Sequence, residues 1–173
     1  ELFNQDDAAS RIRVNTDLQD NLAEKNWPVP LKVALACRKL AAEGHAETLA
    51  GQITAKADGN TFWTNQISGG FSNIRQTTVI RMDENLKVVE GNGIPNPGVR
   101  FHMWIYRARP GINAIVHTHP PHASALSMTG KELAVAHMDV AMFYNDCANL
   151  SHWPGVPIAN EEGRIISEAL GDK

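Results

Sequence analysis

Two histidines at the end of an apolar segment are the residues of this chain best suited to carry chemistry. His117 and His119 follow the apolar run 114–116 and are separated by one residue. Side chains two positions apart on a strand project from the same face, about 7 Å apart along the backbone. Two such imidazoles can bind one metal ion at roughly 2.0–2.1 Å. Pro120 cannot donate a backbone hydrogen bond, so we expect the strand to end there, with both rings at its C-terminal end.

A metal site needs more than two protein ligands, and the chain offers further candidates. They are His102, His137, Asp139 and His152. His137 and Asp139 share one face of a strand-like segment, and two histidines with one carboxylate form the open triad of non-haem iron oxygenases. A structural or surface position is the alternative for each of the two. His102 lies four residues before Tyr106 on one face of a predicted helix, where a hydrogen-bonded histidine and a half-buried tyrosine explain the pair without catalysis.

A second group of residues could bind an anion close to the histidines. A short helix predicted to begin at Pro121 directs its free N–H groups toward the end of the histidine strand. His122, on its first turn, could donate a proton or contact substrate, and an exposed histidine is the alternative reading. The glycine-containing segments 51–52 and 68–70 could hold an anion through backbone N–H groups, although simple turns also explain them.

The hydrophobic pattern indicates which elements position these residues. Strands and helices follow one another without strict β-α-β alternation, so we expect an α/β fold with a largely antiparallel sheet and helices on both faces. Strands are predicted over Thr61–Asn65, 77–83, 86–90, 114–119 and 133–144. Helices are predicted over 31–43, over the segment with apolar residues 101, 104, 105 and 108, over 121–128 and over Asn160–Leu170.

Composition limits the classes of protein to which the chain can belong. Its 173 residues fit one domain at 31–173, preceded by a polar N-terminal arm at 1–30. The formal net charge is −3 and no basic cluster is present, so nucleic-acid binding has no electrostatic support. No apolar run approaches the ~20 residues of a membrane span. Cys37 and Cys147 are far apart, which is typical of reduced thiols in a cytoplasmic protein.

Several short segments together resemble the class II aldolase/adducin family over residues 31–173. They are Leu49-Ala50-Gly51-Gln52-Ile53-Thr54, Phe62-Trp63-Thr64-Asn65, Val88-Val89-Glu90-Gly91, Arg100-Phe101-His102, Tyr106-Arg107-Ala108-Arg109-Pro110 and His117-Thr118-His119. The resemblance implies a three-layer α/β/α fold and a homotetramer with active sites between subunits. It also implies a divalent metal, usually zinc, held by three histidines. His117 and His119 match the first two, and we expect the third, with at least one more strand, beyond Lys173.

Departures from the family pattern narrow the expected substrate. Sugar-phosphate aldolases of this family carry Ser-Ser-Glu where this chain has Asn96-Pro97-Gly98. The Gly-Asn of their phosphate loop corresponds to Gly51-Gln52, and a loop glycine to Ser68. The resemblance therefore implies substrate contacts from Gly51, Gln52, Ser68 and Asn96. It implies neither a phosphorylated sugar nor a glutamate that shuttles the proton.

Three functions fit this pattern. The first is a metal-dependent carbon–carbon lyase that cleaves an unphosphorylated oxo-acid or aromatic acid, by aldol cleavage or decarboxylation, through a metal-stabilised enolate. Decarboxylation needs no glutamate at position 98, and His122 is the expected catalytic residue. The second is a non-haem iron(II) oxygenase of the same fold that acts on an aromatic acid. The third is a non-catalytic, adducin-like binding module. Imidazole ligands suit zinc, manganese and iron alike.

Overall fold

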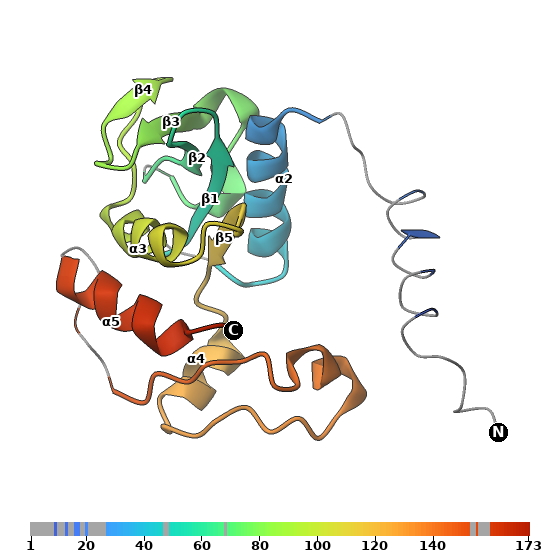
Figure 1. Cartoon of the computed structure of the whole chain (residues 1–173). Coiled ribbons are helices and arrows are strands. Elements are labelled where there is room, and N and C mark those ends of the chain that lie inside the picture. Colours follow the sequence, from blue (N-terminus) through green and yellow to red (C-terminus); the bar gives the residue numbers. More distant parts are fainter. Residues whose placement is uncertain are drawn as a thin grey trace.

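A five-stranded antiparallel sheet forms the centre of the computed structural model, which describes residues 9, 13, 16, 17, 20, 27–46, 49–67, 69–152, 155 and 160–173. The strands are β1 (Gln52–Ala57), β2 (Thr61–Asn65), β3 (Val79–Asp83), β4 (Val88–Glu90) and β5 (Ala114–His117). Their order is β4-β3-β2-β1-β5, and every neighbouring pair is antiparallel (Figure 1). The expected largely antiparallel sheet is therefore confirmed.

Helix α2 (Val29–Ala42) covers one face of the sheet. Its buried residues Val33, Ala34 and Cys37 fall at helical spacing and pack with Ile53 of β1. Gly44, with a φ of +73°, ends the helix in the left-handed conformation that glycine tolerates. The prediction of 31–43 is confirmed to within two residues at its start. The last two residues of the predicted arm belong to the helix, and most of the arm lies outside the described residues.

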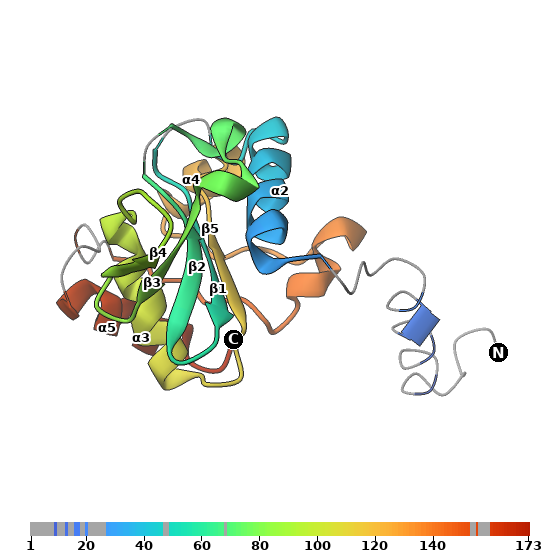
Figure 2. The ribbon, with the colours of Figure 1, turned by 90° about the horizontal axis from the view of Figure 1, so that it is seen from above.

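Helix α3 (Arg100–Ala108) covers the opposite face, so helices flank the sheet on both sides (Figure 2). Met103 and Tyr106 of α3 pack against Phe62 of β2 in a second core. A short 3-10 helix, η3 (Pro97–Val99), leads into α3, and α5 (Asn160–Leu170) lies against its outer side. The three-layer α/β/α arrangement that the sequence implied is therefore present.

The strand predicted over 133–144 is wrong. The structure has a 3-10 helix, η4 (Met138–Phe143), in that segment, and its apolar side chains are largely exposed. The segment is apolar except for His137 and Asp139, but it has no partner strand within the described sheet, and an unpaired strand is not stable. Sequence reasoning also missed β1 as a strand, because its central Thr54 is polar yet completely buried. Helix α4 (Pro121–Ser127) forms where expected, one residue shorter.

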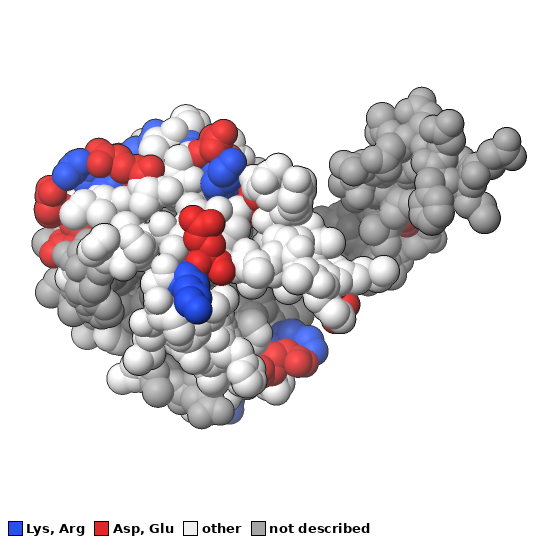
Figure 3. All heavy atoms as spheres, turned by 90° about the horizontal axis from the view of Figure 1, so that it is seen from below, with Lys and Arg blue, Asp and Glu red and all other residues white. Residues whose placement is uncertain are grey.

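Charged side chains of both signs are mixed over the described surface. Figure 3 shows lysine and arginine side chains next to aspartate and glutamate on the face that it presents. Ion pairs such as Arg164–Glu161 (2.7 Å) and Arg81–Glu90 (3.3 Å) follow this pattern. In the part of the chain that the structure describes, no helix is long and apolar enough to cross a membrane.

Candidate functional site

The structure brings the two strand-end histidines side by side. The rings of His117 and His119 lie 4.7 Å apart between centroids and are tilted by 55° to one another. His117 is the last residue of β5, and the backbone N–H of His119 donates to the carbonyl oxygen of His45 at 3.0 Å. This backbone bond ties the residues after β5 to the loop that follows α2. The predicted pair therefore exists, with His117 half-buried and His119 exposed.

Gln52 holds the His117 ring from the neighbouring strand. The two residues are partners in the β1–β5 ladder, and His117 Nδ1 is hydrogen-bonded to Gln52 Oε1. The amide oxygen can only accept, so Nδ1 carries the proton and Nε2 keeps a free lone pair, as a metal ligand requires. The Phe101 ring packs edge-on against the same imidazole, 5.2 Å between centroids.

The electrostatic environment favours the metal-binding form of His117. Burial, with a smaller contribution from the charge of His119, lowers the pKa of His117 to about 4. The ring is therefore neutral at pH 7, and a neutral imidazole is the form that binds metals. Two imidazoles fit zinc, manganese or iron(II) as donors. Among the described residues no group of three potential metal ligands is present, so this pair is an incomplete ligand set by itself.

Residues 51 and 96–98 converge on the same end of the sheet. The Asn96 side chain accepts from the Gly98 N–H at 2.9 Å and donates to the Leu49 carbonyl at 3.0 Å. A Cβ atom at Gly98 would lie 2.9 Å from Gln52 Nε2. The structure thus places Gln52 against His117, with Gly51 directly before it and Asn96 close to it across Gly98. The side chains of Gln52 and Asn96 are hydrogen-bonded to protein groups. Ser68 lies outside the described residues.

The other predicted ligands do not join the histidine pair. His137 and Asp139 have exposed side chains at the start of η4 rather than on a strand, with His137 Nδ1 3.5 Å from Asp139 Oδ2 and accepting from the Asp139 backbone N–H at 3.3 Å. His152 is exposed and bonds the hydroxyl of Ser151 at 2.9 Å. His122 lies on the first turn of α4, three residues after His119, with its side chain exposed.

His102 has a structural environment that sequence reasoning only partly anticipated. Thr54 Oγ1 lies 2.8 Å from His102 Nδ1 and 2.9 Å from the Tyr106 hydroxyl, which donates to the Thr54 carbonyl at 3.1 Å. Burial, and then the charge of His117, lower the pKa of His102 to about 3. The predicted hydrogen bond of His102 is confirmed at Nδ1, whereas Nε2 has no partner within the described residues, and Tyr106 is buried rather than half-buried. The role of Thr54 was missed.

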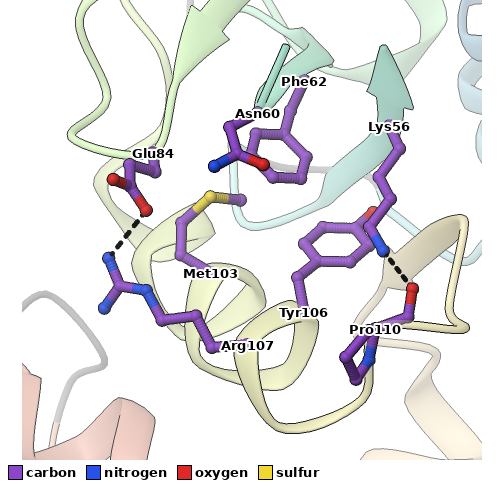
Figure 4. A pocket seen from close by; sticks show the side chains of 8 residues that line it. All are labelled: Lys56, Asn60, Phe62, Glu84, Met103, Tyr106, Arg107 and Pro110. Carbon is purple, nitrogen blue, oxygen red and sulfur yellow. Dashed lines mark hydrogen bonds and ion pairs between the residues drawn. The ribbon is translucent and has the colours of Figure 1, made fainter. Parts of the chain in front are cut away.

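A separate pocket of about 240 Å³ lies at the opposite end of β1 from Gln52 (Figure 4). Phe62, Met103 and Tyr106 form its apolar side. Its two cations are engaged, since Lys56 Nζ donates to the Pro110 carbonyl at 2.5 Å and Arg107 pairs with Glu84 at 3.4 Å. None of the predicted site residues lines it, so the histidine pair remains the candidate functional site.

Residues 31–173 match the family described as the Class II Aldolase and Adducin N-terminal domain. Because this match covers most of the chain, the chain belongs to that family. Its structure is also similar to the solved structure of an L-fuculose 1-phosphate aldolase from Glaciozyma antarctica PI12, with a TM-score of 0.72 and 29% identity. That similarity covers 83% of this chain and 57% of the aldolase. The expected family and fold are both confirmed.

Two bacterial relatives show which chemistries occur in related chains. The "Decarboxylase NovR" of Streptomyces niveus is 31% identical over 157 residues, which is 87% of this chain and 58% of NovR. A 4-hydroxy-3-prenylphenylpyruvate oxygenase/4-hydroxy-3-prenylbenzoate synthase of Streptomyces roseochromogenus subsp. oscitans is also 31% identical, over 87% of this chain and 56% of its own length. The chain therefore spans somewhat more than half the length of these relatives.

Proposed function

We propose that this chain contributes the metal-binding histidines of a carbon–carbon lyase that acts on an unphosphorylated oxo-acid or aromatic acid. The observation that carries this proposal is the neighbouring pair His117 and His119, with the Nδ1 proton of His117 held by Gln52. Both histidines would hold a divalent ion, most simply zinc. When bound, such an ion supplies Lewis-acid polarisation of a substrate carbonyl or hydroxyl oxygen.

The residues around the pair favour decarboxylation over aldol cleavage. No side chain is present at position 98, and a Cβ there would contact Gln52, so the site has no carboxylate base at that position. In decarboxylation the bond to the carboxylate breaks, carbon dioxide leaves, and the electron pair stays on the adjacent carbon until a proton arrives. Only a proton donor is then needed, and we assign that role to His122. The relative named as a decarboxylase supports this choice.

An iron(II) oxygenase is the alternative function. It is supported by the relative named as an oxygenase, which matches this chain as well as the decarboxylase does. Neutral imidazoles bind iron(II) as they bind zinc, so the histidine pair is compatible with both the oxygenase and the lyase. The two differ in what they consume: the oxygenase requires molecular oxygen, whereas the lyase does not.

Metal content is the measurement that tests the proposed function. We expect the purified protein to contain near-stoichiometric zinc or manganese by elemental analysis, and the His117→Ala/His119→Ala variant to contain almost none. The protein should release carbon dioxide from members of a panel of 2-oxo acids and aromatic carboxylates without consuming oxygen. Iron together with oxygen consumption would favour the oxygenase. Absence of metal from the unaltered protein would contradict both enzymes and favour a binding module.

We further propose that copies of this chain assemble as a homotetramer. Large apolar side chains are exposed along the segment that follows β5, which supports burial against another copy. The most exposed are Met128 (87%), Met138 (87%), Met142 (75%) and Tyr144 (69%). Light scattering coupled to gel filtration should give four times the mass of one chain. A Met138→Glu/Met142→Glu variant should lower that mass, and a monomeric unaltered protein would contradict the proposal.

A further inference from the structure

We propose that Gln52 is a positioning residue for His117, and that the missing side chain at position 98 is what permits this role. The inference rests on the proposed function only in assigning His117 to a metal ion. It also changes the expectation from sequence, which placed Gln52 in contact with substrate.

The register of the sheet places Gln52 against His117. The two residues, 65 positions apart in the chain, are paired at the end of the β1–β5 ladder where β1 begins and β5 ends. Gln52 is 4% exposed, so its amide is shielded from water that would otherwise compete for the His117 ring. A buried amide in contact with a ring nitrogen fixes that ring more firmly than a mobile surface side chain does.

The orientation of the Gln52 amide selects one tautomer of His117. Gln52 Nε2 donates to one acceptor, the Ala50 carbonyl oxygen, at 3.5 Å. The oxygen Oε1 therefore faces His117 Nδ1 and can only accept, which leaves the proton on Nδ1. His117 Nε2 is then unprotonated and keeps its lone pair. Without the amide, both tautomers of a neutral histidine become accessible and only one of them presents Nε2 as a ligand.

Gly98 provides the space in which the amide sits. A Cβ atom at this position would lie 2.9 Å from Gln52 Nε2 and 3.2 Å from Gln52 Cδ. It would also lie 3.2 Å from Asn96 Oδ1, and Asn96 is held by bonds to Gly98 and Leu49. Because Asn96 is fixed, Gln52 is the side chain that must move. Positions 52 and 98 are thus coupled: a side chain at 98 displaces the group that holds His117.

Nitrogen-15 NMR of histidine-labelled, metal-free protein tests this role without any enzymatic assay. We expect His117 in the unaltered protein to show protonated Nδ1 and unprotonated Nε2. The Gln52→Leu variant, of similar size but without an acceptor, should show a mixture of tautomers and bind zinc roughly 10- to 100-fold more weakly. Gln52→Glu keeps the acceptor oxygen and should restore both the tautomer and the zinc affinity.

Gly98→Ala supplies the test of coupling, with Gly111→Ala as the matched control because nothing lies within 4 Å of a Cβ at Gly111. Gly98→Ala should weaken zinc binding in the unaltered background but have little further effect in a Gln52→Ala background, whereas Gly111→Ala should have none. An unchanged tautomer and zinc affinity in Gln52→Leu would overturn the inference. Absence of zinc binding in the unaltered protein would instead overturn the proposed function, while the tautomer measurement would still decide the role of Gln52.

Discussion

We expect a His102→Gln variant to lose less unfolding free energy between neutral and acidic pH than the unaltered protein loses. His102 is completely buried, and its pKa in the folded protein is about 3, below the ordinary value of 6.5 that applies to the unfolded chain. The unfolded chain therefore takes up a proton first as pH falls. The stability associated with neutral His102 is fully present above about pH 6.5 and is lost progressively toward pH 3. Between pH 7 and pH 4 this loss is about 3 kcal/mol.

Urea unfolding at pH 7 and at pH 4 measures this effect. Glutamine keeps a polar side chain beside Thr54 but does not titrate, so the drop in unfolding free energy should be about 3 kcal/mol smaller in the variant. His117 contributes to acid sensitivity in both proteins and does not obscure the difference. His152→Gln, at an exposed position, is the control and should leave the pH dependence unchanged. Equal drops in all three proteins would contradict the assignment to His102.

A Gly51→Ala variant is expected to be destabilised by about 1–3 kcal/mol through overpacking. A Cβ atom at Gly51 would lie 2.6 Å from the Phe71 ring, well inside van der Waals contact. Phe71 is 2% exposed and belongs to the core beneath α2, so its ring has no room to withdraw. Shifting the Gly51 backbone instead would disturb its carbonyl, which accepts from the Asn65 side chain at 3.3 Å.

Unfolding free energies of three variants separate overpacking from a general effect of adding a methyl group. Gly111→Ala should be nearly neutral, because nothing lies within 4 Å of its Cβ. Gly51→Ala should cost less stability when it is introduced into a Phe71→Leu protein than when it is introduced into the unaltered protein, because leucine leaves space where the ring was. If Gly51→Ala were as stable as Gly111→Ala, the close approach of Phe71 would be refuted.

Hydrophobic periodicity was sufficient to predict most elements of the fold. Strand β2 and helix α5 have the bounds that the pattern predicted, since both elements have clear turn signals or a regular apolar stripe. Periodicity did not predict the positions at which a polar residue is buried or an apolar residue is exposed. Thr54 is polar but lies in the core, where His102 and Tyr106 bond its hydroxyl, and Met138 is apolar but exposed. Tertiary contacts decide such positions, and a single sequence does not contain them.

The proximity of the two histidines was predictable from the sequence, whereas the contact that Gln52 makes with His117 was not. His117 and His119 are two positions apart in sequence, and the strand predicted over 114–119 would place them on one face, although β5 itself ends at His117. Gln52 supports His117 only because β1 and β5 pair in a register that sets the two residues opposite each other. Sequence spacing does not specify that register, since a shift by one residue would turn the Gln52 side chain to the other face. Family resemblance pointed to Gln52 but to a different role.

The strand that carries His117 lies at the edge of the described sheet and is hydrogen-bonded there to β1 alone. Edge strands open more readily than central ones, so their amide protons exchange with solvent through local opening rather than global unfolding. An ion bound by His117 would stabilise only the closed form and would slow that exchange in proportion to ligand occupancy. Hydrogen exchange of the β5 backbone amides would therefore report whether the site is occupied, without a substrate and without knowledge of the reaction.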